Sequence, residues 1–172
     1  MGKQLIIDKD NAVKAFNEAE PGLKKVLSTL FGKEVLCQNP LEWVSSFADI
    51  CQAAGEDEAQ YIIPASATYK LAMDICQDKV DLIAKVLNGD WVEDLADTSQ
   101  RKHYPYFNII VDKAAPGGFR LSFDVSAYDF DFSHFGVRPT YRDGKTSDFA
   151  GRTFVAEYQA FGQYQKLYRS NK

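Results

Sequence analysis

The stretch from Asn88 to Val111 divides the chain into two halves of different character. A long helical pattern ends at Asn88-Gly89, because Asn and Gly readily adopt the left-handed backbone conformation that terminates a helix. Trp91 and a polar loop follow, and then comes Tyr106–Val111, an apolar run rich in aromatic and β-branched residues that is typical of a strand. Since helical patterns precede this stretch and strand patterns follow it, the sequence predicts an α+β fold.

The first half, about residues 1–89, contains apolar residues at helical spacing in four segments. Helix-capping residues and glycines separate these segments, so we expect about four helices. They begin at Asp10-Asn11, Pro21, Pro40 and about Ser66, and the last three end at Gly32, Gly55 and Asn88.

The second half, about residues 90–172, contains 17 of the 23 aromatic residues, which favour half-buried pleated surfaces. Strands at 106–111 and 119–125, joined by a turn at 114–118, predict a hairpin. A third strand is expected at 137–142, where Pro139 implies an edge or a bulge. Thr146 or Ser147 then caps a closing helix. We therefore expect a small antiparallel sheet of about three strands with a C-terminal helix packed on it, and Trp91 buried where the long helix meets the sheet.

Length and charge restrict the classes of protein further. The 172 residues suit a single domain over 1–172, and the net charge of −4 argues against a protein that wraps nucleic acid or coats an anionic membrane. We find no signal-peptide pattern and no apolar run of the roughly 20 residues that a membrane helix needs. The three cysteines are odd in number and well separated, as expected for reduced thiols in a cytoplasmic protein.

Sequence motifs for catalysis or cofactor binding are missing. There is no glycine-rich phosphate loop, no nucleophile elbow and no close cysteine pair, so we expect no cofactor, no metal site and no enzymatic activity. The run from Asp129 to Ser133 alternates oxygen ligands but lacks the glycine and glutamate of a calcium loop. His103 and His134 could approach a carboxylate near a serine such as Ser122, Ser126 or Ser133, which leaves a small hydrolase as a third functional hypothesis.

Basic and aromatic residues mix in two places in the second half. Residues 120–172 carry eight Lys and Arg against six Asp and Glu, a local charge of +2 within an acidic chain. Aromatic rings beside arginines can stack and hold single-stranded bases. The candidate interaction surface consists of Arg101, Lys102, His103, Tyr104, Arg138, Tyr141 and Arg142.

Six short segments occur in order through nearly the whole chain and together form a recognisable set. They are 30–33 (LFGK), 47–51 (FADIC), 87–91 (LNGDW), 103–107 (HYPYF), 118–119 (GF) and 149–154 (FAGRTF). With them the chain resembles a family of small proteins encoded by gut bacteria and their phages. That family has no established activity, so the resemblance implies a compact phage-related protein in a cytoplasmic setting and no site residues.

These observations lead to one functional hypothesis and two alternatives. The absence of catalytic signatures and the excess of aromatic residues favour a non-enzymatic interaction protein that binds a protein partner or itself. The first alternative is a single-stranded nucleic-acid-binding protein, and the second is the small hydrolase. No membrane partner is expected.

Overall fold

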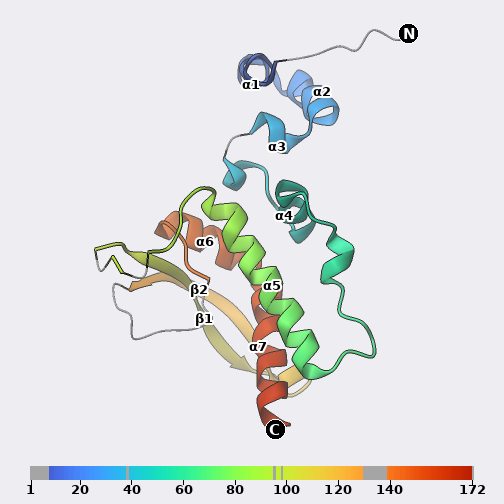
Figure 1. The fold of residues 1–172 in the computed structure, drawn as a ribbon, viewed down its shortest axis with the longest axis vertical. Helices are drawn as coiled ribbons and strands as arrows, with labels where there is room; N and C mark the ends of the chain where they lie inside the picture. Colours follow the sequence, from blue (N-terminus) through green and yellow to red (C-terminus); the bar gives the residue numbers. More distant parts are fainter. Residues whose placement is uncertain (1–7, 38, 95, 98, 130–138, 172) are drawn as a thin grey trace. The chain divides into compact units, whose positions relative to one another are not determined.

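The computed structural model describes residues 8–37, 39–94, 96–97, 99–129 and 139–171 (Figure 1). The chain forms two compact units, Met1–Val44 and Ser45–Lys172. The helix α5 and the hairpin described below, which lie on either side of residue 89, belong to the same unit. A single domain over residues 1–172 stays a prediction.

The first unit is helical. Asp8 caps its first helix by accepting hydrogen bonds from the backbone N–H groups of Asp10 and Asn11, so this helix begins earlier than the predicted Asp10-Asn11 cap. Pro21 opens the second helix and Gly32, with φ of 79°, ends it, as predicted. The elements are α1 (Lys9–Glu18), α2 (Pro21–Phe31), α3 (Lys33–Leu36) and the short 3-10 helix η1 (Pro40–Glu42).

The second unit begins with the helices α4 (Phe47–Ala54) and α5 (Tyr69–Asn88), with the 3-10 helix η2 (Glu58–Tyr61) between them. The helix predicted to run from Pro40 to Gly55 is in fact broken before α4. Ser46 starts α4 through a capping box, in which its hydroxyl accepts from the Asp49 N–H and the Asp49 carboxylate accepts from the Ser46 N–H. This reciprocal cap fixes a new helix start that the apolar stripe alone does not reveal.

The hairpin consists of β1 (Lys102–Val111) and β2 (Phe119–Asp129), joined through the 3-10 turn η3 (Pro116–Gly118). The strands pair antiparallel, and Asp124 is an extra residue on β2 that forms a bulge opposite Tyr106 and Phe107. The prediction of about three strands was too high for the described residues, since the sheet there has two. The predicted third strand at 137–142 begins outside these residues, and its described part makes a single bridge from Tyr141 to His103.

Two helices, α6 (Gly144–Thr153) and α7 (Val155–Ser170), replace the single closing helix of the prediction. The cap of α6 is Asp143, whose Oδ1 accepts from the Thr146 N–H at 2.7 Å, and neither Thr146 nor Ser147 has that role. Phe154 separates the helices because its backbone leaves the helical region (φ −112°, ψ 27°) while its side chain is buried.

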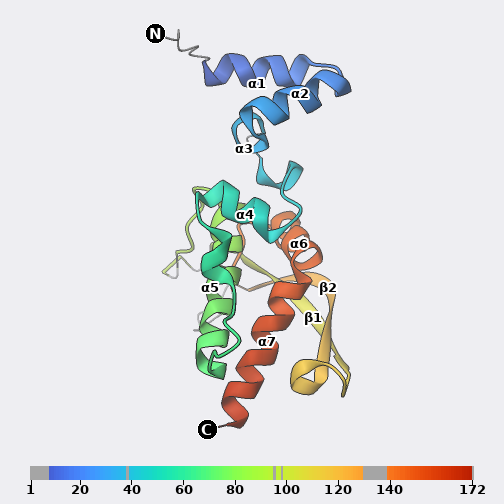
Figure 2. The ribbon, with the colours of Figure 1, turned by 90° about the vertical axis from the view of Figure 1, so that its right-hand side faces the viewer.

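The helices of the second unit cover one face of the hairpin. In Figure 2, α7 lies between α5 and the hairpin and packs along α5, and α6 lies at the upper end of the hairpin, where it contacts both strands. The α+β prediction is confirmed.

Trp91 is half-buried, whereas the sequence predicted that it would be fully buried. None of the helices among the described residues has the length and apolar character to cross a bilayer. The fully buried side chains at the centre of the unit include Ile50, Val80, Ile83, Leu87, Tyr141 and Phe154.

Candidate functional site

The hairpin is held against α6 by a very close approach at Gly151. A Cβ atom added to Gly151 would lie 2.2 Å from a ring carbon of Phe123 and 2.8 Å from the Cβ of Pro105. Only a residue without a side chain leaves room for this contact, which fixes the position of both strands on the helix. The edges of the hairpin are therefore presented by a rigid support.

Side chains from the helices cover the outer edge of β2. The Asp148 carboxylate accepts from the Ser126 N–H at 3.0 Å, and the Gln159 side chain accepts from the Leu121 N–H at 3.1 Å. Gln163 donates to the Phe119 carbonyl at 3.0 Å. These bonds satisfy three of the backbone groups that a neighbouring strand would otherwise pair, so the outer edge of β2 is protected at Phe119, Leu121 and Ser126.

The outer edge of β1 is covered at its beginning. His103 and Tyr141 exchange two backbone hydrogen bonds, of 3.1 and 2.7 Å. Asn88, the last residue of α5, holds this short segment in place, because its side-chain amide donates to the Thr140 carbonyl and accepts from the Arg142 N–H. The Tyr141 hydroxyl, 2.5 Å from that of Tyr158, anchors the segment in the core. Among the described residues, this segment bonds the outer edge of β1 at His103 alone.

Beyond His103 the outer edge of β1 has no partner among the residues that the structure describes. Backbone groups along a strand point alternately to its two sides. Those of His103 point outward to Tyr141, whereas the Asp112 N–H points inward and donates to the Gly118 carbonyl. Alternation therefore directs the N–H and C=O groups of Phe107, Ile109 and Val111 outward, and no hydrogen bond within the described chain satisfies them. We call these three residues the open edge.

An apolar hollow of about 360 Å³ lies beside the open edge, on the face of the hairpin that α7 covers. The Phe107 ring on its wall contacts Tyr158 of α7, with ring centroids 5.0 Å apart. This hollow, which we call the β1 groove, can receive side chains from a strand added at the edge. Its lining includes Phe107, Ile109, Leu121, Tyr158, Phe161 and Gly162.

Exposed apolar residues surround the open edge. Ile109 is 71% exposed and Val111 is 78% exposed, which is unusual for two β-branched residues on one short segment of strand. Tyr106, Ile110 and Val125 are also about half exposed and come from the same hairpin. The open edge thus combines unpaired backbone groups with apolar surface, the two features that favour pairing with another strand.

The basic and aromatic residues predicted from the sequence do not form one surface. Lys102 is buried, and its Nζ donates to the carbonyls of Asp97 and Gln100 at 3.2 Å. Tyr141 is completely buried. Neither side chain is accessible to a phosphate or a base.

The other residues of that predicted set lie in several environments. Arg101 is exposed, with its guanidinium 5.1 Å from the centre of the Tyr128 ring. Arg142 is partly exposed, 3.4 Å from the Asp143 carboxylate. Tyr104 is half-buried on the wall of the β1 groove. Arg138 lies outside the described residues.

The structure brings one hydrolase candidate pair together. His103 Nδ1 and Ser126 Oγ lie 3.5 and 3.7 Å from the point where a Cβ of Gly144 would stand. Burial lowers the pKa of His103, and the nearby Asp143 carboxylate partly offsets this effect. Ser126 Oγ is buried and makes no hydrogen bond within the described chain, so the structure shows no bond from this hydroxyl to His103 of the kind that activates a nucleophile. The other candidates, His134 and Ser133, lie outside the described residues.

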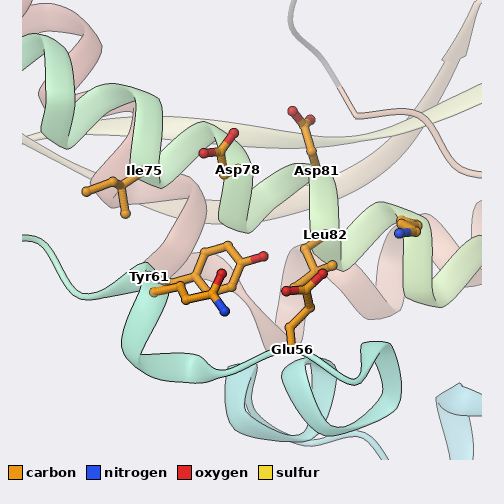
Figure 3. Close-up of a pocket in the computed structure, with 8 residues that line it drawn as sticks. Glu56, Tyr61, Ile75, Asp78, Asp81 and Leu82 are labelled. Atoms are coloured by element: carbon orange, nitrogen blue, oxygen red, sulfur yellow. The ribbon is translucent and has the colours of Figure 1, made fainter.

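A second hollow, of about 370 Å³, lies between η2 and α5 and is polar (Figure 3). Glu56 and Tyr61 lie on one side of it, whereas Asp78 and Asp81 extend away from them. Burial raises the pKa of Asp81, and the hydrogen bond from the Gln77 side chain partly offsets this. Because the carboxylates do not converge, this hollow lacks the geometry of a cation site.

No group of three or more metal-ligating side chains occurs in the part of the chain that the structure describes. Comparisons with protein-family models, curated proteins and solved structures found no match. The function must therefore be inferred from the geometry of this chain alone.

The sequence did not direct attention to the open edge. Its signals were Pro105, which is tolerated in a sheet mainly on an edge strand, and the absence of charged residues from Tyr104 to Val111. The predicted interaction surface instead followed the charged residues at neighbouring positions, because charge is a usual signature of a binding surface.

Proposed function

We propose that this chain is a non-enzymatic interaction protein that binds an extended protein segment by strand addition at the open edge. The observation that carries this proposal is the contrast between the two edges of one hairpin. Helix side chains satisfy outward backbone groups of β2, whereas those of Phe107, Ile109 and Val111 have no partner among the described residues. From Phe107 to Val111 this edge carries neither the charged residues nor the prolines that normally block an exposed strand edge.

Strand addition divides the task of recognition between backbone and side chains. The backbone of the added strand would pair with the open edge, and each hydrogen bond would contribute about 0.5–1.5 kcal/mol. Its alternate side chains would enter the β1 groove between Ile109 and Phe161. The partner is therefore an extended segment with apolar side chains at every second position.

Single-stranded nucleic acid is the alternative ligand, and the exposed Arg101 beside the Tyr128 ring is the observation that favours it. With Lys102 and Tyr141 buried, fewer groups are left to contact phosphates and bases than the sequence suggested. Fluorescence anisotropy with labelled single-stranded DNA and RNA distinguishes the two ligands, because phosphate contacts make binding strongly dependent on salt.

Two further proposals concern the setting of the protein. We propose that the chain belongs to the gut-bacterial and phage family that it resembles. We also propose a cytoplasmic location, supported by the free thiols of Cys37, Cys51 and Cys76. Burial raises the pKa of Cys76 to about 11, which keeps this thiol protonated and unreactive.

The test is selection from a displayed library of short peptides against the full chain, followed by affinity measurements on two variants. Ile109→Pro removes an outward N–H, and Ile109→Ala shortens the same side chain but keeps that N–H. We expect the proline variant to lose at least about tenfold in peptide affinity and the alanine variant to lose less. Selected peptides that bind wild type and Ile109→Pro equally, or a selection without binders, would contradict the proposal.

A further inference from the structure

We propose that the strand added at the open edge is β1 of a second copy of this chain, so that two hairpins form one four-stranded antiparallel sheet. This inference rests on the proposed strand addition and specifies its partner. It is argued from the register that the open edge allows, from its charge and from the size of the sheet.

The open edge is self-complementary in one antiparallel register. A twofold axis at Ile109 places this residue opposite its counterpart in the second copy and places Phe107 opposite Val111. All three residues direct their backbone groups outward, so each opposed pair forms both of its hydrogen bonds, about six across the junction. The paired segment of five residues is roughly 17 Å long, an ordinary strand length.

The two ends of this segment explain why pairing stops there. Pro105 would lie opposite Lys113, and it has no N–H to donate. One step further, the outward groups of His103 are already bonded to Tyr141. The register about Ile109 therefore uses both outward backbone groups of Phe107, Ile109 and Val111 and requires no N–H from Pro105.

Charge also favours a second copy over a charged peptide. Residues 104–111 contain no ionisable side chain except the tyrosines, so pairing β1 with itself brings no like charges together along the open edge. The nearest acidic group beyond this run, Asp112, is already paired with Arg120 at 2.8 Å. A partner strand must be apolar at the positions that face the β1 groove, and β1 meets this requirement with Phe107, Ile109 and Val111.

The small size of the hairpin is a further reason to expect pairing between two copies. A two-stranded hairpin is marginal by itself, and three or more strands are usually needed for an independently stable sheet. Here the helices support one face only, and Tyr106, Ile110 and Val125 on this hairpin are about half exposed. Pairing through β1 makes each hairpin half of a four-stranded sheet, in which the protected β2 strands become the outer edges.

The test measures the mass of the full chain by sedimentation equilibrium from low to high micromolar concentration. Wild type should shift from one copy to two. Ile109→Pro should weaken association at least about tenfold, and it should still fold because its lost N–H makes no bond to β2. Ile109→Ala keeps the backbone group, so it should associate more tightly than Ile109→Pro.

Cysteine cross-linking tests the register and does not depend on the proline variant. Opposed residues of a hydrogen-bonded antiparallel pair have Cα atoms about 5.5 Å apart, a separation that a disulfide can bridge. Ile109→Cys should therefore form a covalent dimer on mild oxidation. Val125→Cys, a half-exposed position on β2, serves as the matched control and should cross-link much more slowly.

Several results would overturn the proposal. They are a wild-type chain that stays a single copy at every concentration, equal association of wild type and Ile109→Pro, and Val125→Cys cross-linking as fast as Ile109→Cys. If the chain stays a single copy but still binds library peptides through Ile109, the proposed pairing of two copies is wrong and the proposed strand addition stands. The two proposals are thus tested separately.

Discussion

Replacing Gly151 with alanine tests how the hairpin is held on α6. Alanine is the best helix former, so in an exposed helix this change would stabilise by about 1 kcal/mol. At Gly151 the new methyl group would overlap the Phe123 ring, with carbon atoms 2.2 and 2.4 Å away, and would press on Pro105 at 2.8 Å. The close packing and the helix propensity therefore act in opposite directions.

The overlap is the larger effect. Carbon atoms in contact normally lie about 3.5–4.0 Å apart, so the Phe123 ring would have to move by more than an ångström. Both neighbours resist this, because Phe123 is packed against the Phe107 ring and Pro105 has a fixed backbone angle. Overpacking of this kind costs about 1–3 kcal/mol and sometimes more, so we expect a net loss of about 1–2 kcal/mol after the gain in propensity.

Urea denaturation followed by far-UV circular dichroism measures this loss. Gly162→Ala in α7 is the matched control, because its new Cβ would meet the Phe119 ring at 3.4 Å, an ordinary contact. That variant should match wild type or exceed it by up to about 1 kcal/mol. If Gly151→Ala were as stable as wild type, the direct contact between α6 and the hairpin would be refuted.

Two further predictions concern the segment that protects the start of β1. Tyr141→Phe should lower the free energy of unfolding by about 1–3 kcal/mol, because it leaves the buried Tyr158 hydroxyl without its partner. Adding Tyr158→Phe to this variant should lower the free energy of unfolding little further. Urea denaturation of the two single variants and the double variant checks this, and additive losses would contradict it. Burial lowers the pKa of His103 in the folded state, so the unfolded chain binds that proton more tightly and stability should fall as the pH drops through about 6.5. Denaturation across this pH range should show a smaller fall for His103→Gln, and an identical fall would contradict the assignment.

Helices and the hairpin were largely predictable because their signals are local. Pro21, Gly32 and the Asn88-Gly89 stop marked helix ends correctly, and the turn at 114–118 correctly joined two strands. The predicted helix boundaries were wrong where a side-chain cap, or a contact between residues distant in sequence, determines where a helix begins or ends. The start of α4 depends on the reciprocal bonds of Ser46 and Asp49, which apolar spacing does not report.

The candidate site was much less predictable than the fold. Lys102 appeared as a surface cation, but the structure buries it against carbonyls, and Tyr141 is buried because Asn88 and Tyr158 draw its segment into the core. Whether a strand edge is open depends on side chains from other elements, such as Asp148 and the α7 glutamines on β2. Sequence patterns describe which residues form a strand, but they do not show which of its edges is covered.

Residue-resolved amide hydrogen exchange tests the open edge most directly. In dilute solution the amides of Phe107, Ile109 and Val111 should exchange rapidly, while those of Asn108 and Ile110, which point toward β2, should be protected. When the chain associates or binds a selected peptide, the three outward amides should become protected and the alternation should disappear. Protection of these amides in dilute solution, or rapid exchange that persists after association, would contradict the account.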